Sequence, residues 1–221
     1  MKILRLLLFL FLTFTLLPAP SYGASITDQV KRHYANMTSL EADFTQELHH
    51  KESGNTEQRA GVFLFKKPLL VHWKTNTPAP ELLIISDKEI WNVFPDELLA
   101  YKYPLDVIDN SGNIIKVITG QTPIDETFSV EGETREGQLI KLHLFPHEPV
   151  QSLTEAFLWV EESGLIKKVK LFDFFGNVNT IAFTQHRVGK QFDKGTFTFS
   201  PPKGYEVEFK GKDGVENTLL R

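Results

Sequence analysis

The sequence contains no cysteine in its 221 residues. A chain without cysteine has no disulfide, no thiolate metal ligand, no cysteine nucleophile and no cysteine that carries a lipid anchor. Basic residues are also outnumbered, with 24 Lys and Arg against 28 Asp and Glu, which gives a net charge of −4. Because nucleic-acid binding depends on a basic surface, this balance argues against a nucleic-acid partner.

A long apolar run occurs at the N-terminus and is too short to span a bilayer. Residues 6–17 are almost all Leu and Phe, follow Lys2 and Arg5, and end before a Pro-Ala-Pro break. A spanning helix needs roughly 17–25 apolar residues, whereas a secretory signal peptide has a basic start, a short apolar region and small residues before the cut. We therefore predict a signal peptide over residues 1–23, cleaved after Gly23, and an exported, soluble mature protein.

The mature chain, residues 24–221, reads as one domain. Its length suits a single sizeable core, and no linker rich in Pro, Gly or Ser divides it. Ser25 and Asp28 form a capping-box pattern, and apolar residues then recur at helical spacing from Ile26 to Met37. This predicts an amphipathic helix over residues 26–39.

From residue 40 the apolar period changes to two, which indicates strands. A first strand is expected over 40–49, and a series of short strands separated by turn residues follows it. We expect this series at 60–66, 70–74, 82–86, 89–94, 98–102, 127–131, 140–145, 156–161, 166–173, 178–186 and 196–200. Gly176-Asn177 has the composition of a two-residue hairpin turn. About 11 such strands predict one large antiparallel sheet, strongly curved or closed into a barrel.

One segment interrupts the strands. Ile114, Ile115, Val117 and Ile118 lie between a polar stretch that ends at Asn113 and a glycine at position 120. We expect a short helix of about two turns there, capped by Asn113. Its β-branched residues lower helix propensity, so the segment needs tertiary packing.

No motif of a known catalytic class appears in the sequence. The seven histidines show no HExxH spacing, and the chain contains neither a GxSxG elbow nor a GxxxxGK[ST] loop. The acidic pairs fall on turns, where charged residues are common. We therefore expect no enzyme, no metal site and no cofactor.

Many of the predicted strands are apolar on both faces. Residues 61–65 and 82–85 are apolar at both parities, and in residues 90–94 only Asn92 is polar. A sheet with one wet face alternates cleanly, so these strands are expected to be covered on both sides. Two arrangements fit this pattern: a barrel core with helices packed outside, or a large apolar cavity covered by helices and meant for an apolar guest.

An ordered set of motifs identifies a resemblance that covers essentially the whole mature chain. The motifs are Phe44-Thr45-Gln46, the run from Gly61 to Pro68, Trp73, Pro78, Ser86-Asp87, Trp91, Phe172-Asp173, Gly176-Asn177 and the terminal run from Phe197 to Gly204. In order and spacing the chain resembles the periplasmic outer-membrane lipoprotein carrier family, LolA. The resemblance implies a mainly β fold: a single incomplete antiparallel β-barrel of about 11 strands, covered by the N-terminal helix and the short central helical segment.

The resemblance also implies a function and its sites. The family shields the acyl chains of lipoproteins in the periplasm, receives them from an inner-membrane ABC transporter and passes them to an outer-membrane receptor. We expect a monomer with an acyl-chain cavity and a lid. The expected cavity residues are Phe63, Phe65, Trp73, Leu83, Ile85, Trp91 and Val93, and the expected lid residues are Lys67, Ile114, Ile115, Val117 and Ile118.

Lys67 departs from the family pattern. The family carries Arg immediately before the Pro of this motif, and that Arg hydrogen-bonds to the lid. Lysine keeps the charge but lacks the planar fork of donors, so we expect a weaker lid contact. Two alternatives stay open: a related carrier of another acylated lipid, and an envelope-stress sensor domain of the same fold.

Overall fold

The computed structural model describes residues 24–107 and 114–210, so the predicted signal peptide and the predicted cap Asn113 lie outside the described residues. The helical elements are α1 (Ile26–Asn36), η1 (Pro95–Glu97), η2 (Leu105–Val107), α2 (Ile114–Ile118) and α3 (Ile124–Thr127). The strands are β1 (Ser39–His49), β2 (Thr56–Lys66), β3 (Leu70–Thr77), β4 (Glu81–Ile85), β5 (Ile90–Phe94), β6 (Leu99–Tyr103), β7 (Phe128–Glu136), β8 (Leu139–Pro146), β9 (Glu155–Glu161), β10 (Ile166–Phe172), β11 (Val178–Val188) and β12 (Glu206–Phe209).

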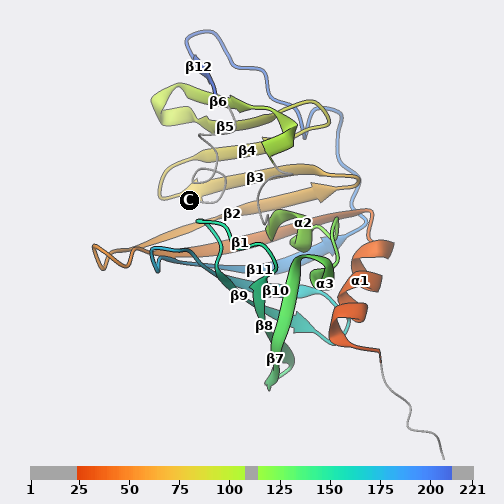
Figure 1. Cartoon of the computed structure of the whole chain (residues 1–221). Helices are drawn as coiled ribbons and strands as arrows, with labels where there is room; N and C mark the ends of the chain where they lie inside the picture. Colours follow the sequence, from red (N-terminus) through yellow and green to blue (C-terminus); the bar gives the residue numbers. More distant parts are fainter. Residues whose placement is uncertain (1–23, 108–113, 211–221) are drawn as a thin grey trace, which may run out of the picture.

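All twelve strands belong to one sheet, in the order β12-β6-β5-β4-β3-β2-β1-β11-β10-β9-β8-β7. Neighbouring strands are antiparallel except β12, which runs parallel to β6. The sheet bends around α2 and α3, and its two edge strands, β12 and β7, stay apart (Figure 1). The prediction of an incomplete, mainly antiparallel barrel with a helical cover is therefore confirmed, and the alternative of a closed barrel is wrong.

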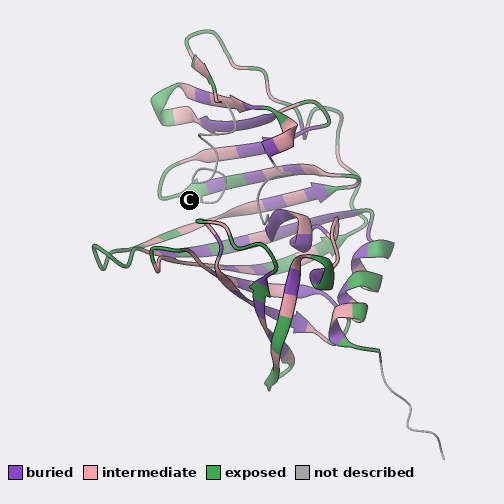
Figure 2. Ribbon diagram, in the orientation of Figure 1, coloured by how far each residue is buried: buried purple, intermediate pink, exposed green. Residues whose placement is uncertain are grey.

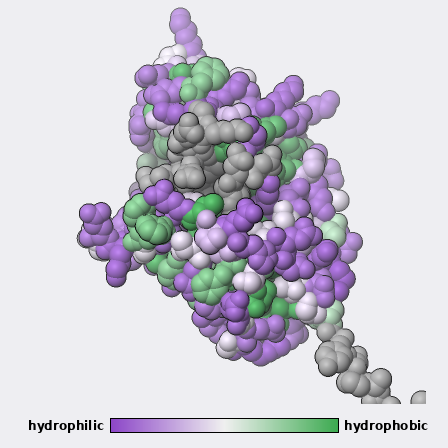
Figure 3. Space-filling model, viewed as in Figure 1, coloured by the Kyte–Doolittle hydropathy of each residue, from purple (hydrophilic) through white to green (hydrophobic). Residues whose placement is uncertain are grey.

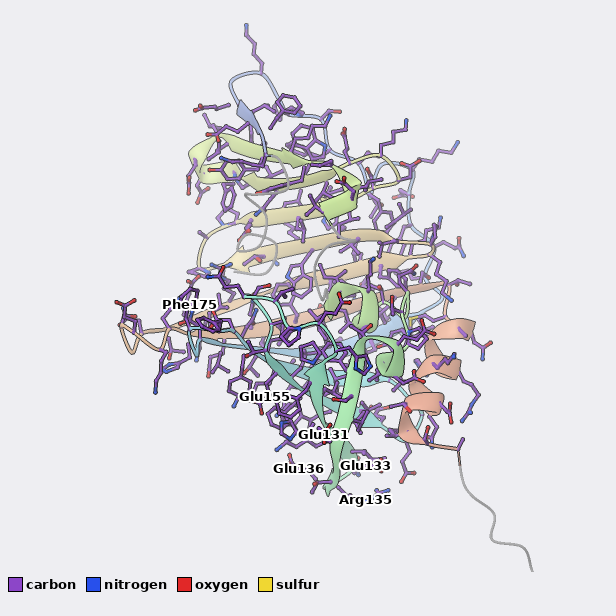
Figure 4. The ribbon with its side chains drawn as sticks, in the orientation of Figure 1. Glu131, Glu133, Arg135, Glu136, Glu155 and Phe175 are labelled. Atoms are coloured by element: carbon purple, nitrogen blue, oxygen red, sulfur yellow. The ribbon has the colours of Figure 1, made fainter. Side chains whose placement is uncertain are left out.

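The exposed edge strand β7 carries a row of charges. Glu131, Glu133, Arg135 and Glu136 are exposed and lie along the free half of its hairpin with β8, away from the helices (Figure 4). Charged side chains on an edge strand oppose pairing with the strand of another molecule. The charges at this edge therefore oppose edge-to-edge pairing with another molecule.

Two details of the predicted strand series are wrong. Residues 196–200 form no strand, because Phe199 packs on a ring of the sheet and the Thr196 carbonyl accepts a side-chain hydrogen bond, while two prolines follow directly. The strand β12 lies further along the chain. The β10–β11 connection is a five-residue loop, residues 173–177, in which the Asp173 carboxylate accepts from the backbone N–H of Asn177 at 2.8 Å.

Helix α1 forms as its sequence predicts, over a slightly shorter range. The Ser25 hydroxyl accepts from the backbone N–H of Asp28 at 3.1 Å and caps the first turn. Ile26, Val30 and Tyr34 are buried on one side of the helix. The Tyr34 hydroxyl accepts from the backbone N–H of Ile166 at 3.4 Å, and burial raises the pKa of this tyrosine. Helix α1 is thus docked on the end of β10.

Helix α2 ends in a Schellman motif. The N–H of Gly120 donates to Val117 and that of Gln121 to Lys116, at 3.0 and 2.7 Å. Gly120 has φ +67°, and a Cβ at this position would meet the Tyr34 Cβ at 2.2 Å. Glycine is therefore required at position 120 for two reasons, the left-handed conformation and the close approach of α1.

The sheet has two faces that are covered differently. We call the side that carries α1, α2 and α3 the inner face and the opposite side the outer face. Figure 2 shows buried residues continuing from the sheet into the sides of the helices that lie against it. The main apolar core is shared between the inner face and these helices, whereas a second, smaller apolar cluster lies on the outer face of β4, β5 and β6.

Candidate functional site

The middle of the inner face is a continuous apolar surface built by strand register. Phe63 on β2 lies opposite Trp73 on β3, which lies opposite Leu83 on β4. One pleat closer to the helices, Phe65, Val71 and Ile85 form a second row in the same way. Because side chains alternate across a strand, both rows point to the same side. The residues of these two rows are all at most 5% exposed.

Aromatic rings join this surface to β1 and β11. The Trp73 ring lies 4.9 Å from that of Phe44 and 5.2 Å from that of Phe63, measured between centroids. Phe183 lies 5.6 Å from Phe63 and 6.2 Å from Trp73. These tilted and edge-on contacts are favourable for aromatic rings. The inner face therefore presents a stiff, aromatic floor.

Helix α2 covers part of this floor. Ile114, Ile115, Val117 and Ile118 are each at most 3% exposed and belong to the same apolar core as Phe63 and Phe65. A helix of five residues, four of them β-branched, has little stability of its own. Its structure depends on packing against the sheet and against Tyr34 of α1. Four residues that the sequence assigns to the lid thus share one buried core with five that it assigns to the cavity, Phe63, Phe65, Trp73, Leu83 and Ile85.

Among the atoms coloured in the space-filling view, hydrophilic residues predominate on the side of the helices. Apolar residues form separate patches there (Figure 3). The two rows of the apolar floor are themselves buried, with each residue at most 5% exposed.

Lys67 connects the sheet to α1 rather than to α2. Its Nζ donates to the Ala35 carbonyl in the last turn of α1 at 2.8 Å, and its backbone N–H donates to Thr38 at 3.0 Å. A cation is favourable at a helix C-terminus, where carbonyls are unpaired. The next residue, Pro68, accepts from the side-chain amide of Gln121, directly after α2. The Lys67-Pro68 corner therefore contacts the cover at two places.

Trp91 and Val93 do not belong to the inner face, so their assignment to the cavity is wrong. Trp91 lies opposite Ile84, one position out of phase with Leu83, and Val93 lies opposite Leu82. Both side chains belong to the outer cluster, where the Phe199 ring lies 5.4 Å from that of Trp91. β5 is apolar at both parities, so its composition gives no indication of which side faces the helices.

The outer face is closed by the segment between β11 and β12. His72 on the outer side of β3 donates from Nδ1 to the Thr196 carbonyl of this segment at 2.7 Å. Burial lowers the pKa of His72, which favours the neutral ring in this contact. Phe199 and Tyr205 then pack over the small cluster around Trp91. This segment covers the outer face of the sheet, as a second sheet or a helix does in other folds.

The inner face also carries polar groups that the sequence motifs do not include. Arg59 on β2 donates from Nε to Glu57 at 2.6 Å and from Nη1 to Glu81 at 3.1 Å. Glu81 is hydrogen-bonded to the side chain of Asn92, which is 1% exposed. The signal for these residues was available, since Arg59 and Glu57 continue the parity of Phe63 and Phe65 along β2. Polar residues at strand positions that face the core interrupt the apolar pattern of the strand.

The described residues hold neither a metal-ligand cluster nor a membrane-spanning helix. Over 24–107 and 114–210, no group of three or more His, Asp or Glu residues is arranged to hold a metal ion. In the same part of the chain, no helix is long and apolar enough to cross a membrane.

Comparisons with known proteins agree on one family. The family model described as "Outer membrane lipoprotein carrier protein LolA" matches residues 35–200. The "Outer-membrane lipoprotein carrier protein" of Nitrosomonas europaea is 25% identical over 203 residues, which are 92% of this chain and 98% of that protein. The protein of the same name from Chromobacterium violaceum is 23% identical over 191 residues, 86% of this chain and 90% of the relative.

A solved structure has the same fold at low identity. An uncharacterized conserved protein from Thermus thermophilus superposes with a TM-score of 0.54 at 13% identity, over 84% of this chain and 97% of that one. This similarity concerns the fold alone. Because the family model matches well over half of the sequence, the chain belongs to the outer membrane lipoprotein carrier family, LolA.

Proposed function

We propose that this protein is a periplasmic carrier that binds the acyl chains of lipoproteins on its inner face. The observation that carries the proposal is the aromatic floor around Phe63 and Trp73 under a short helical cover, in a chain of the LolA family. Two relatives named as outer-membrane lipoprotein carriers support the same role. The proposal includes no chemical step and no cofactor.

The floor and the cover explain how a carrier both shields and releases its guest. Removing each CH₂ from water contributes about 0.8 kcal/mol, so free acyl chains do not cross an aqueous compartment unaided. Ile115 and its neighbours in α2 occupy the floor when the guest is absent. Binding must then displace these apolar residues, and the cost of displacement lowers the net affinity. An acceptor with a stronger site can therefore take the guest.

The proposed route of transfer is the one that the resemblance to the family implies. Lipoproteins enter from an inner-membrane ABC transporter and leave to an outer-membrane receptor, and the signal peptide over residues 1–23 exports the carrier to the periplasm. The carrier acts as a monomer in this scheme. The weak intrinsic helix propensity of α2 suits a cover that opens on contact with such partners.

The test is capture of a triacylated lipoprotein by the purified mature chain. Inner-membrane vesicles that contain the lipoprotein and its ABC transporter are incubated with ATP and carrier, the vesicles are sedimented, and soluble lipoprotein is measured. We expect a soluble one-to-one complex, and mass spectrometry of carrier purified from its native envelope should show acylated protein. The same lipoprotein with its acylated cysteine replaced by serine is the control and should not be captured.

Two results would contradict the proposal. If acylated and unacylated forms are captured equally, the inner face does not bind acyl chains. If the native envelope yields the protein loaded with a different acylated lipid and it ignores lipoproteins, the related carrier of another lipid is the correct function.

A further inference from the structure

The polar residues of the inner face form one connected chain across three strands. Glu57 and Arg59 lie on β2, Glu81 lies on β4 and Asn92 lies on β5. Hydrogen bonds run from Arg59 to both glutamates, and Glu81 is bonded to the Asn92 side chain. Thr75 on β3, 4% exposed and directly opposite Glu81, lies between the two ends. The chain borders the aromatic floor, since Asn92 lies opposite Leu83.

This arrangement fixes the orientation of the Asn92 amide. An ionised carboxylate only accepts hydrogen bonds, so the Asn92 Nδ2 group must be the one that faces Glu81. The Oδ1 atom is then left over, and it is buried without a hydrogen-bond partner among residues 24–107 and 114–210. Burial raises the pKa of Glu81, while the bond from Asn92 and the charge of Arg59 act in the opposite direction.

A buried acceptor without a partner is unusual, because most buried polar groups are hydrogen-bonded. The cost of this unpaired acceptor offsets part of what the bond from Asn92 to Glu81 contributes to folding. The acceptor sits at the edge of an apolar floor, so its complement is a single donor attached to an otherwise apolar molecule.

We propose that Asn92 recognises the amide N–H of an N-acylated guest, with Oδ1 as acceptor and the Glu57–Arg59–Glu81 chain as positioning residues. An acyl chain attached through an amide carries one such donor, whereas a chain attached through an ester carries none. The two carboxylates also disfavour a free fatty acid, whose negative charge would lie beside them. The inner face therefore distinguishes guests by how the chain is linked.

This inference rests on the proposed carrier function and is tested with two probes that differ by one group. N-palmitoylglycine methyl ester has an amide N–H where O-palmitoylglycolic acid methyl ester has an ester oxygen. Displacement of a fluorescent fatty-acyl probe from the mature chain gives the affinity of each. We expect the amide to bind about tenfold more tightly, which corresponds to one hydrogen bond at a buried acceptor.

Variants assign the preference to Asn92. Asn92→Leu should bind both probes equally, with affinity for the ester undiminished. Glu81→Gln still offers an acceptor to Nδ2 and should keep the preference. Gln46→Leu is the matched control, because Gln46 is a buried amide on the same face whose Nε2 donates to Asn179 at 3.1 Å instead. Its removal should leave the preference at about tenfold.

The outcomes separate this inference from the proposed function. Equal binding of amide and ester by the wild-type protein overturns the recognition by Asn92 and leaves the carrier function intact. Failure of both probes to displace the fluorescent acyl group overturns the carrier function itself. A preference that survives in folded Asn92→Leu also overturns the assignment. The wild-type comparison needs no variant, so a variant that fails to fold does not prevent the test.

Discussion

The inner and outer faces of β2 to β6 are both apolar, yet their covers are of different kinds. The outer cover is a segment tied to the sheet at both ends, by the Gly189 N–H bonded to Ser39 and by the parallel pairing of β12 with β6. The inner cover consists of short helices that depend on side-chain packing. Apolar residues on both sides of a strand therefore indicate that the sheet is covered on both faces. Of these two covers, only the less firmly attached one, the short helices of the inner face, suits exchange with a guest.

The two faces also differ in their polar residues. On the outer face the polar side chains are paired: His72 donates to the Thr196 carbonyl of the cover, and the Trp91 indole N–H donates to Glu89 at 2.7 Å. On the inner face the acceptor of Asn92 stays without a partner among the described residues. The polar groups of the outer face are therefore paired within the protein, whereas the Oδ1 atom of Asn92 on the inner face can still accept a hydrogen bond from a guest. Substitutions at four positions test this comparison of the two faces and are given in order of expected effect.

The largest effect is expected at the centre of the inner face. Phe65→Glu places a charge where the native ring is 0% exposed, which costs several kcal/mol of folding free energy unless the floor opens to water. We expect capture of an acylated protein to fall at least a hundredfold. The measurement is capture by the folded fraction, judged by circular dichroism, and undiminished capture would mean that the guest does not bind on the inner face.

The matched change on the outer face should affect stability alone. Trp91→Ala removes a ring that packs on Phe199 and should lower the free energy of unfolding by about 3–4 kcal/mol. Acyl-probe affinity below the unfolding transition should stay as in the wild type. Urea titration measures the first quantity and probe displacement the second. A loss of probe affinity comparable to that of Phe65→Glu would mean that the guest occupies the outer face.

Release of the guest should respond to Lys67 more than capture does. Lys67→Leu removes the hydrogen bond to the Ala35 carbonyl, worth about 1–2 kcal/mol, and shifts the balance of closed and open cover by roughly five- to thirtyfold. We expect normal capture and slow delivery to acceptor membranes, and Lys67→Arg should deliver at least as well as the wild type. Equal delivery by all three proteins would exclude Lys67 from closure of the cover.

The smallest effect concerns the anchor of the outer cover. Glu41 is 7% exposed and hydrogen-bonds to Lys190 and Arg187, and these contacts lower its pKa below the ordinary value of 4.5. A lowered folded pKa stabilises the protein above pH 4.5, and this contribution is lost as the pH falls through the folded pKa. Glu41→Gln should cost about 1–2 kcal/mol at neutral pH and flatten this acid-side loss. Thermal unfolding between about pH 3 and 7 measures both, and a parallel pH dependence in the variant would exclude Glu41 as its source.

The sequence by itself determined the types of element and the family. Alternation of period two from residue 40, the cap at Ser25 and the glycine at position 120 each act within a few residues, so local chemistry decides them. The same holds for the apolar content of the inner floor, since Phe63 and Phe65 have one parity in one strand. The ordered motifs identified the LolA family without any spatial information.

Only the tertiary structure decided which side of a two-sided strand faces the helices. The apolar run of β5 is compatible with either orientation, and its pairing with β4 sets Asn92 inward and Trp91 outward. The tertiary structure likewise made residues 196–200 a cover instead of a strand, because its partners on β3 and β5 lie more than a hundred residues away. The unpartnered atom of Asn92 is also a product of burial, which no pattern of neighbouring residues expresses.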